Sequence, residues 1–247
     1  MRISLTYLIL FSGIVFFFSC IDKKYNQVPK EATEEKEIVN SITVTDSVKE
    51  FRISEIEFSC ESPLLYTVNK KSENKYVFSQ NKKEEESHSF FSINNDYFNE
   101  ITHDTPFALQ QGNNVVLAFS CLPNGVSCKN KNSHLFKNYI QGEDLGLFNE
   151  KQEHLFYYLP KDTVYAENVI LDFYLMNTSL NKNGKKVRAT IDGMEFLIEK
   201  WTAYNIEGLE EGIHTIRIEL IDKEGNLIPG PFNDSGERKI LVLKKIA

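Results

Sequence analysis

Arginine and tryptophan are scarce in this sequence. Its 247 residues include five arginines and one tryptophan, and acidic residues outnumber lysine plus arginine by 35 to 28, for a formal charge of -7. Nucleic acid and anionic lipid are poor partners for such an acidic chain, because both attract basic surfaces. A dedicated phosphate or carboxylate clamp is usually richer in arginine. We therefore expect no nucleic-acid partner.

Histidine and cysteine are too few and too scattered to predict a metal site. No two of the five histidines have the spacing of a zinc motif, and Cys-x-x-Cys is absent from the sequence. Residues 222–226 and 233–237 offer oxygen ligands, but neither segment follows the calcium-binding loop pattern. Ordinary β-turns use the same residue types. We expect no metal and no cofactor.

The longest apolar run lies at the start of the chain. Residues 8–18 are almost entirely apolar, Arg2 precedes them, and Ser19 and Cys20 follow. The run is shorter than the roughly 20 residues that span a bilayer, and it is typical of an export signal. We predict that residues 1–19 are a signal peptide and that cleavage makes Cys20 the new N-terminus.

The residues before Cys20 resemble the lipobox of bacterial lipoproteins. Phe17 stands where leucine is usual, and Ser19 stands where glycine or alanine is common. The resemblance implies lipidation of Cys20, by palmitate among other acyl chains, and several acyl chains anchor a protein firmly. We expect a bacterial cell-envelope location, with the outer membrane favoured and most of the chain outside the cytoplasm. An uncleaved anchor or an ordinary secretory signal is the alternative.

Residues 20–50 are predicted to be a flexible linker. They contain no glycine, a single aromatic residue at Tyr25, and a mixed charged run over residues 30–37. Such a composition buries too little apolar surface to fold. The segment therefore predicts a tether between the acylated end and the rest of the chain.

Beyond residue 50 the hydrophobic pattern has period two nearly everywhere. Alternation and short apolar runs predict strands at residues 52–59, 75–79, 87–93, 114–120, 168–177, 186–191, 194–201, 214–221 and 239–243. No long stretch has the continuous apolar face of a helix, so an all-β fold is favoured over α/β. We predict two β-sandwich domains, at residues 51–160 and 161–247.

Residues 208–226 resemble the penultimate hairpin of Ig-like and fibronectin-III-like modules on exported bacterial proteins. Apolar and polar residues alternate there from Ile216 to Leu220, and glycines flank the run. Residues 169–242, with 114–133 upstream, are similar to bacterial lipoproteins built from two β-rich parts. The resemblance implies an Ig-like C-terminal sandwich, but it identifies no functional residues.

Three cysteines remain after Cys20, and an exported location permits disulfides. Cys121 and Cys128 enclose a short segment that contains proline and glycine, so we predict a local disulfide between them. Cys60 is then a small buried residue, although its pairing with either of the other two stays open.

Trp201 and His134 are the predicted ligand-binding residues. Strand alternation places Trp201 on the same face as Glu199, and a neighbouring charge favours an indole that is partly exposed. His134 ends the loop that begins at Cys121, which we expect at the junction of the two domains. His214 stands at a strand start two residues after Gly212, and its ring is expected to bond a turn carbonyl. Rigid sandwiches usually present ligands on loops.

These observations predict a non-catalytic binding or interaction module for a protein, peptide or glycan, with no catalytic residues. Two other classes stay open. A hydrolase would use Cys128 with His134, or a carboxylate pair such as Asp104 and Glu143, within one pocket. A structural or assembly subunit of an envelope complex would display an apolar patch or donate a strand.

Overall fold

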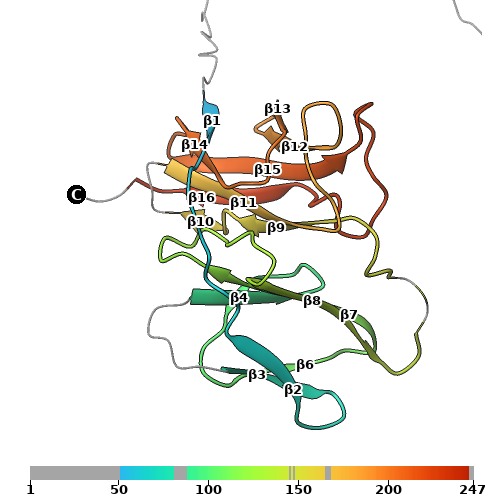
Figure 1. The fold of residues 1–247 in the computed structure, drawn as a ribbon. Coiled ribbons are helices and arrows are strands. Elements are labelled where there is room, and N and C mark those ends of the chain that lie inside the picture. Colours follow the sequence, from blue (N-terminus) through green and yellow to red (C-terminus); the bar gives the residue numbers. More distant parts are fainter. Residues whose placement is uncertain (1–50, 81–87, 145, 147, 165–167, 245–247) are drawn as a thin grey trace, which may run out of the picture. The chain divides into compact units, whose positions relative to one another are not determined.

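The computed structural model describes residues 51–80, 88–144, 146, 148–164 and 168–244 (Figure 1). These residues belong to one compact unit that runs from Val48 to Ala247. The predicted signal peptide, Cys20 and most of the predicted linker lie outside the described residues. Every regular element in the described part is a strand, so the predicted all-β sandwich fold is confirmed. No described helix could cross a membrane.

The described residues form sixteen strands in four sheets. In chain order the strands are β1 (Arg52–Glu55), β2 (Tyr66–Lys70), β3 (Lys75–Gln80), β4 (His88–Ile93), β5 (Asn99–Glu100), β6 (Thr105–Ala108), β7 (Gly112–Cys121), β8 (His134–Gln141), β9 (His154–Leu159), β10 (Thr163–Val164), β11 (Asn168–Met176), β12 (Lys186–Ile191), β13 (Met194–Ile198), β14 (Tyr204–Glu207), β15 (Gly212–Ile221) and β16 (Arg238–Val242).

The four sheets make two sandwiches with the same strand order. In the first sandwich, β2-β3-β6 faces β5-β4-β7-β8, and the two sheets share a core that includes Phe78, Phe91 and Val116. In the second, β9-β11-β14 faces β13-β12-β15-β16 over a core that includes Leu171 and Ile218. Three strands facing four is an Ig-like arrangement. The second sandwich adds β1 beside β14 and β10 beside β16.

The sandwiches repeat each other in local detail. β7 and β15 both span ten residues and begin at Gly112 and Gly212. Each is followed by the same turn, in which Gly125 and Gly225 have φ of 85° and 89°. A glycine adopts this left-handed conformation at little cost, so the turn can be tight. The chain therefore contains an internal structural repeat with an offset of one hundred residues.

Buried polar side chains repeat as well. Asn114 Nδ2 donates to the carbonyl of Gln110 at 2.8 Å. At the equivalent position, His214 Nε2 lies 2.8 Å from the carbonyl of Glu210, so the predicted contact between His214 and a turn carbonyl is confirmed. Both residues satisfy the loop that enters the long strand, and this need explains a polar group inside each core.

β7 and β15 differ in which of their faces are buried. Residues 114–121 of β7 are all buried, and the side chains on its second face, among them Leu117 and Phe119, join a cluster with Phe156 and Tyr174 of the second sandwich. β15 has one partly exposed face, so its sequence alternates. The continuous apolar run of β7 thus reflects its place between two cores.

The predicted limit between domains 51–160 and 161–247 does not follow these sandwiches. β1 pairs with β14, where Arg52 faces Glu207, and β9 pairs with β11. Both β1 and β9 therefore belong to the second sandwich. The apolar run of β9 has no alternation because it is buried on both faces, so period two could not assign it to a sheet.

Candidate functional site

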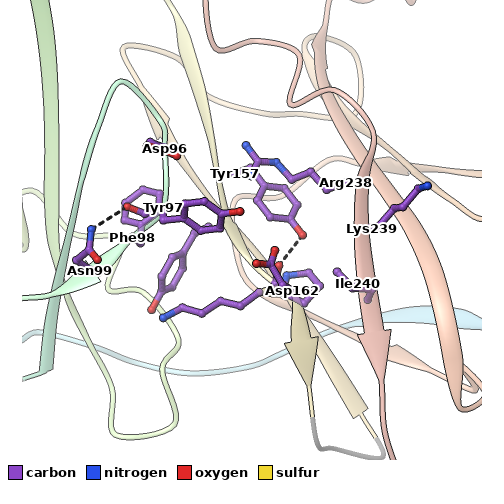
Figure 2. Close-up of a pocket in the computed structure, with 12 residues that line it drawn as sticks. Asp96, Tyr97, Phe98, Asn99, Tyr157, Asp162, Arg238, Lys239 and Ile240 are labelled. Atoms are coloured by element: carbon purple, nitrogen blue, oxygen red, sulfur yellow. Dashed lines mark hydrogen bonds between the residues drawn. The ribbon is translucent and has the colours of Figure 1, made fainter.

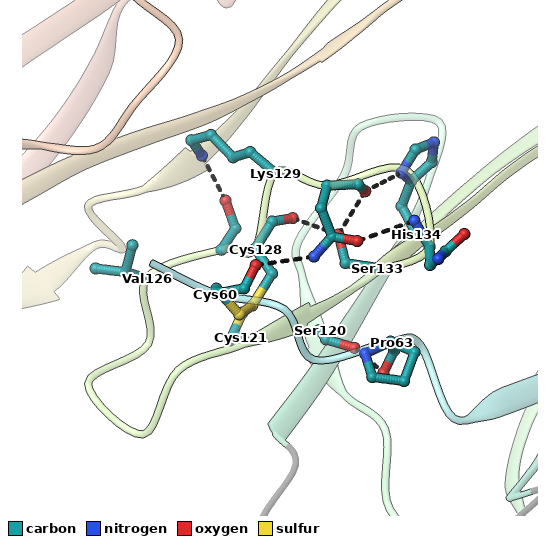
Figure 3. Close-up of a disulfide and its surroundings, with 12 residues drawn as sticks. Cys60, Pro63, Ser120, Cys121, Val126, Cys128, Lys129, Ser133 and His134 are labelled. Carbon is teal, nitrogen blue, oxygen red and sulfur yellow. Dashed lines mark hydrogen bonds between the residues drawn. A yellow bond between two sulfur atoms is a disulfide. The ribbon is translucent and has the colours of Figure 1, made fainter. Parts of the chain in front are cut away.

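The junction between the sandwiches carries at least three pockets and a disulfide. One pocket is lined by Tyr97 and Arg238 among others (Figure 2), another is lined by His134 and Trp201, and a third is lined by Cys60 and Lys200 among others. All three draw residues from both sandwiches. The disulfide lies where the chain passes from β1 toward the first sandwich (Figure 3).

Residues 56–64 connect the two sandwiches. Ile56 N donates to the carbonyl of Ala203 at 2.9 Å, in the second sandwich. At the other end, Leu64 N donates to the carbonyl of Asn132 at 2.9 Å, in the first. The segment between them carries Cys60. We call residues 56–64 the strap.

The strap is fixed by a disulfide, and the predicted pairing of Cys121 with Cys128 is wrong. Cys60 is bonded to Cys128, with their Cα atoms 5.4 Å apart, and Cys121 is a buried free thiol. Cys121 lies opposite Ser127 in an antiparallel bridge. Because adjacent residues in extended chain point to opposite sides, Cys128 faces away from Cys121 and toward the strap.

The thiol of Cys121 is buried and hydrogen-bonded. Its Sγ lies 3.5 Å from the hydroxyl of Tyr158, and burial raises the pKa of the thiol to about 12. The thiolate is the nucleophilic form of cysteine, so Cys121 is protonated and unreactive at neutral pH.

A buried ion pair crosses the junction. Lys129 Nζ lies 2.6 Å from Asp172 Oδ1, and the two side chains are 8% and 0% exposed. Lys129 also donates to the hydroxyl of Ser127 and to the carbonyl of Phe173, and Asp172 Oδ2 accepts from Ser127 N at 2.8 Å. Buried charges are tolerated only when they are paired and hydrogen-bonded in this way. The pair therefore fixes the loop after β7 against β11.

Trp201 packs against this pair. Lys129 Nζ lies 5.7 Å from the ring centroids of both Tyr174 and Trp201, which is within cation–π range. The indole Nε1 donates to the carbonyl of Phe173 at 3.1 Å, and the Tyr174 hydroxyl donates to the carbonyl of Cys128 at 2.9 Å. Trp201 is half-buried, so one part of the ring holds the junction and another part is accessible to solvent.

The two predicted binding residues lie in one pocket. Trp201 and His134 line a cavity of 680 Å³ that we call the junction pocket; other residues on its wall are Lys129, Lys131, Asn177 and Lys185. His134 Nδ1 lies 3.3 Å from the carbonyl of Asn130, and burial lowers the pKa of the ring. The imidazole is therefore neutral at pH 7, and positive charge in the pocket comes from its lysines.

The residues of the hydrolase alternative have other roles. Cys128 Sγ is bonded to Cys60, so it cannot act as a nucleophile. Asp104 lies 3.5 Å from His103 on an exposed turn, and Glu143 is exposed. The junction pocket instead offers lysine charges, hydrogen-bonding groups and the aromatic ring of Trp201.

The acidic turns of the second sandwich use their oxygens internally. Asp222 Oδ1 accepts from Asn226 N and Glu224 N at 2.9 Å each, and these bonds lower the pKa of Asp222. Asp234 accepts two bonds from Arg217, which lower its pKa. Across the described residues, no three His, Cys, Asp or Glu side chains gather as metal ligands would.

Comparisons with known proteins add little to this geometry. No family model and no curated protein matches the sequence. Among solved structures, the chain is similar to the fibronectin(III)-like modules of Clostridium thermocellum CbhA, with 13% identity, a TM-score of 0.30, and coverage of 73% of this chain and 95% of that one. A likeness this weak carries no functional argument. The Ig-like assignment rests on the strand pairing.

Sequence reasoning missed the ion pair that organises the junction. A signal was present, because Asp172 is the only charged residue within the apolar run of β11. An ionisable residue in the middle of such a strand indicates a buried partner. The partner, Lys129, is 43 residues away along the chain and lies in a polar loop, so no local pattern could identify it.

Proposed function

We propose that this chain is an acylated lipoprotein of the bacterial envelope whose two sandwiches act together as a non-catalytic binding module. The membrane anchor in this proposal rests on the sequence around Cys20. The outer membrane is the favoured location, and the partner is a protein, peptide or glycan.

The observation that supports a binding module most strongly is the buried pair Lys129–Asp172 beneath the junction pocket. Because the pair and the disulfide fix the two sandwiches to each other, the pocket walls from both sides keep one geometry. A ligand pays little ordering entropy when it binds a preformed site. A rigid junction with a half-exposed indole and lysines suits recognition of a surface group on a partner.

Anchoring is tested by labelling the protein with palmitate in a bacterial host. The wild-type protein should take up label and stay in the membrane fraction, and Cys20→Ala should lose both properties. A Cys20→Ala variant that still fractionates with membranes and labels normally would contradict the anchor.

Binding at the junction pocket is tested by a thermal-shift screen against peptides and oligosaccharides. Native-state ligands raise the melting temperature. Lys131 is exposed on the pocket wall, so Lys131→Glu should abolish the shift caused by a ligand of this pocket. The matched control is Lys70→Glu, an exposed lysine at the end of β2, which should leave the shift intact. Equal shifts in both variants would place the ligand elsewhere.

A further inference from the structure

The second junction pocket has a different chemistry. We call it the Tyr97 pocket. It has a volume of 510 Å³, and the residues that line it include Asp96, Tyr97, Asn99, Lys161, Asp162 and Arg238. Asp96 and Tyr97 come from the segment between β4 and β5, Asn99 is the first residue of β5, and the others come from the second sandwich (Figure 2). The two pockets share no residue among those that line them.

Arg238 is the feature that points to a ligand. Its guanidinium lies over the ring of buried Tyr157, 4.5 Å from the centroid, and its Nε atom is buried with no hydrogen-bond partner among the described residues. The other three arginines that the structure describes each pair with a carboxylate: Arg52 with Glu207, Arg188 with Glu219, and Arg217 with Asp234. A buried donor without an acceptor is costly. Because Nε itself is enclosed, an acceptor from outside would bond the terminal nitrogens of the guanidinium, which pairs with no carboxylate among the described residues.

Tyr97 provides an aromatic surface beside Arg238. Its side chain is 66% exposed, whereas the next residue, Phe98, is 7% exposed and packs into the cluster between the sandwiches. Phe98 therefore anchors the segment, and Asn99 Nδ2 donates to the carbonyl of Tyr97 at 3.3 Å. In Figure 2 the ring of Tyr97 extends toward Tyr157. An exposed ring held this way can stack on the apolar face of a ligand ring.

The charges around the pocket favour a ligand with one carboxylate and several hydroxyl groups. Lys161, Lys239 and Arg238 line it with Asp96 and Asp162, so three cations face two carboxylates in a chain whose net charge is -7. Asp96 and Asp162 accept hydrogen bonds from hydroxyl groups, which an acidic side chain does not offer.

We propose that the Tyr97 pocket binds an acidic saccharide, a uronic acid unit of a glycan. The sugar carboxylate accepts hydrogen bonds from Arg238, whose planar fork matches carboxylate geometry. The sugar ring stacks on Tyr97, and its hydroxyl groups bond Asp96, Asn99 and Asp162. The scarcity of arginine in the sequence argued against a carboxylate clamp, but a single arginine suffices when the fold leaves it without a carboxylate.

The test is a calorimetric titration of the full chain in detergent with an oligogalacturonate. Wild-type protein should bind it, and Tyr97→Ala and Arg238→Gln should each weaken binding by about tenfold or more, as expected for loss of a charge-assisted bond or a stacked ring. Tyr97 is exposed, so Tyr97→Ala tests the site even if Arg238→Gln fails to fold. The matched control is Arg52→Gln, an exposed arginine on β1, which should bind as wild type does.

Two further ligands separate the alternatives. The methyl ester of the oligogalacturonate lacks the negative charge and should bind at least about tenfold more weakly than the acid. Oligoglutamate carries carboxylates without a sugar ring and should not bind. The proposal is overturned if the oligogalacturonate does not bind, if neither variant changes its affinity, or if oligoglutamate binds equally well. Lys131→Glu should have no effect, so this proposal and the junction pocket can fail separately.

Discussion

At the scale of single residues, a few buried polar side chains determine how the two sandwiches meet. Asp172 interrupts the apolar strand β11. Its buried carboxylate pairs with Lys129 and accepts a hydrogen bond from Ser127 N. The sequence identifies Asp172 as unusual but not its partner, because the pairing depends on the loop after β7 folding back across the junction. The identity of Asp172 indicates the need for a partner, although the sequence analysis did not predict one, and only the tertiary structure shows where that partner lies.

Removing one member of this pair should be much worse than removing both. Lys129→Met leaves the Asp172 carboxylate buried without a counter-charge, which should lower the free energy of unfolding by about 3 to 5 kcal/mol. Lys129→Met combined with Asp172→Leu should recover a large part of that loss. Urea denaturation measures both values.

Lys185→Met is the control for that comparison. Lys185 pairs with Glu153 near the surface, so its loss should change the unfolding free energy by less than about 1 kcal/mol. A Lys129→Met variant as stable as Lys185→Met would contradict the role assigned to the buried pair.

The burial of His154 should make the free energy of unfolding depend on pH. The residue is buried next to Phe148 and Phe136, its Nε2 lies 3.1 Å from the carbonyl of Asn149, and burial lowers its pKa below the ordinary 6.5. The unfolded chain therefore binds this proton more readily than the folded chain. Stability is fully present above about pH 6.5 and falls as the pH drops below it.

Chemical denaturation between neutral and mildly acidic pH tests this effect. His154→Gln should show a shallower loss of stability than wild type below the ordinary histidine pKa, because the neutral amide does not titrate. His134 has a pKa lowered in the same direction, so some slope should persist. An unchanged slope in His154→Gln would contradict the assignment.

At the scale of elements, period-two patterning predicted several strands that have one partly exposed face. It missed β2, β6, β8 and β14, which also have partly exposed residues. β12 and β15 alternate and were predicted from that pattern. Consecutive side chains of β9 are buried because they face two different cores. β1 is distant in sequence from β14, the strand with which it pairs. The local pattern predicted a strand at β1 but none at β9, and it could not assign β1 to a sheet, because that assignment depends on contacts distant in sequence.

The strap should depend on its disulfide. The bond joins residues separated by 68 positions, and closing a loop of that length removes unfolded-state entropy equivalent to about 4 kcal/mol. Reduction, or Cys60→Ala, should lower the free energy of unfolding by a comparable amount. Mass mapping of non-reduced peptides should recover Cys60 linked to Cys128.

Cys121 distinguishes this pairing from a local one. Cys121→Ala should remain as sensitive to reductant as wild type, because Cys121 is not in the bond. A Cys121→Ala variant that has lost its sensitivity to reductant would support the local pairing and contradict the strap.

At the scale of the whole molecule, two repeats of one sandwich are held together by the Lys129–Asp172 ion pair, the Cys60–Cys128 disulfide and an aromatic cluster between the sandwiches. The repeat was hidden in the sequence because β7 is buried on both faces and β15 on one, so equivalent strands have different patterns. The predicted binding residues Trp201 and His134 share one pocket only because the junction brings the two repeats together. The binding that we propose at either pocket depends on that junction staying closed.

The single tryptophan makes the closed junction directly measurable. Trp201 packs against Tyr174 and Lys129, so its fluorescence reports the junction, while far-ultraviolet circular dichroism reports the strands of both sandwiches. In urea, the two signals should change together in one transition, because the sandwiches unfold as a unit. If the Trp201 signal changes at a lower urea concentration than the dichroism, the sandwiches separate before they unfold, and the account of one rigid module is wrong.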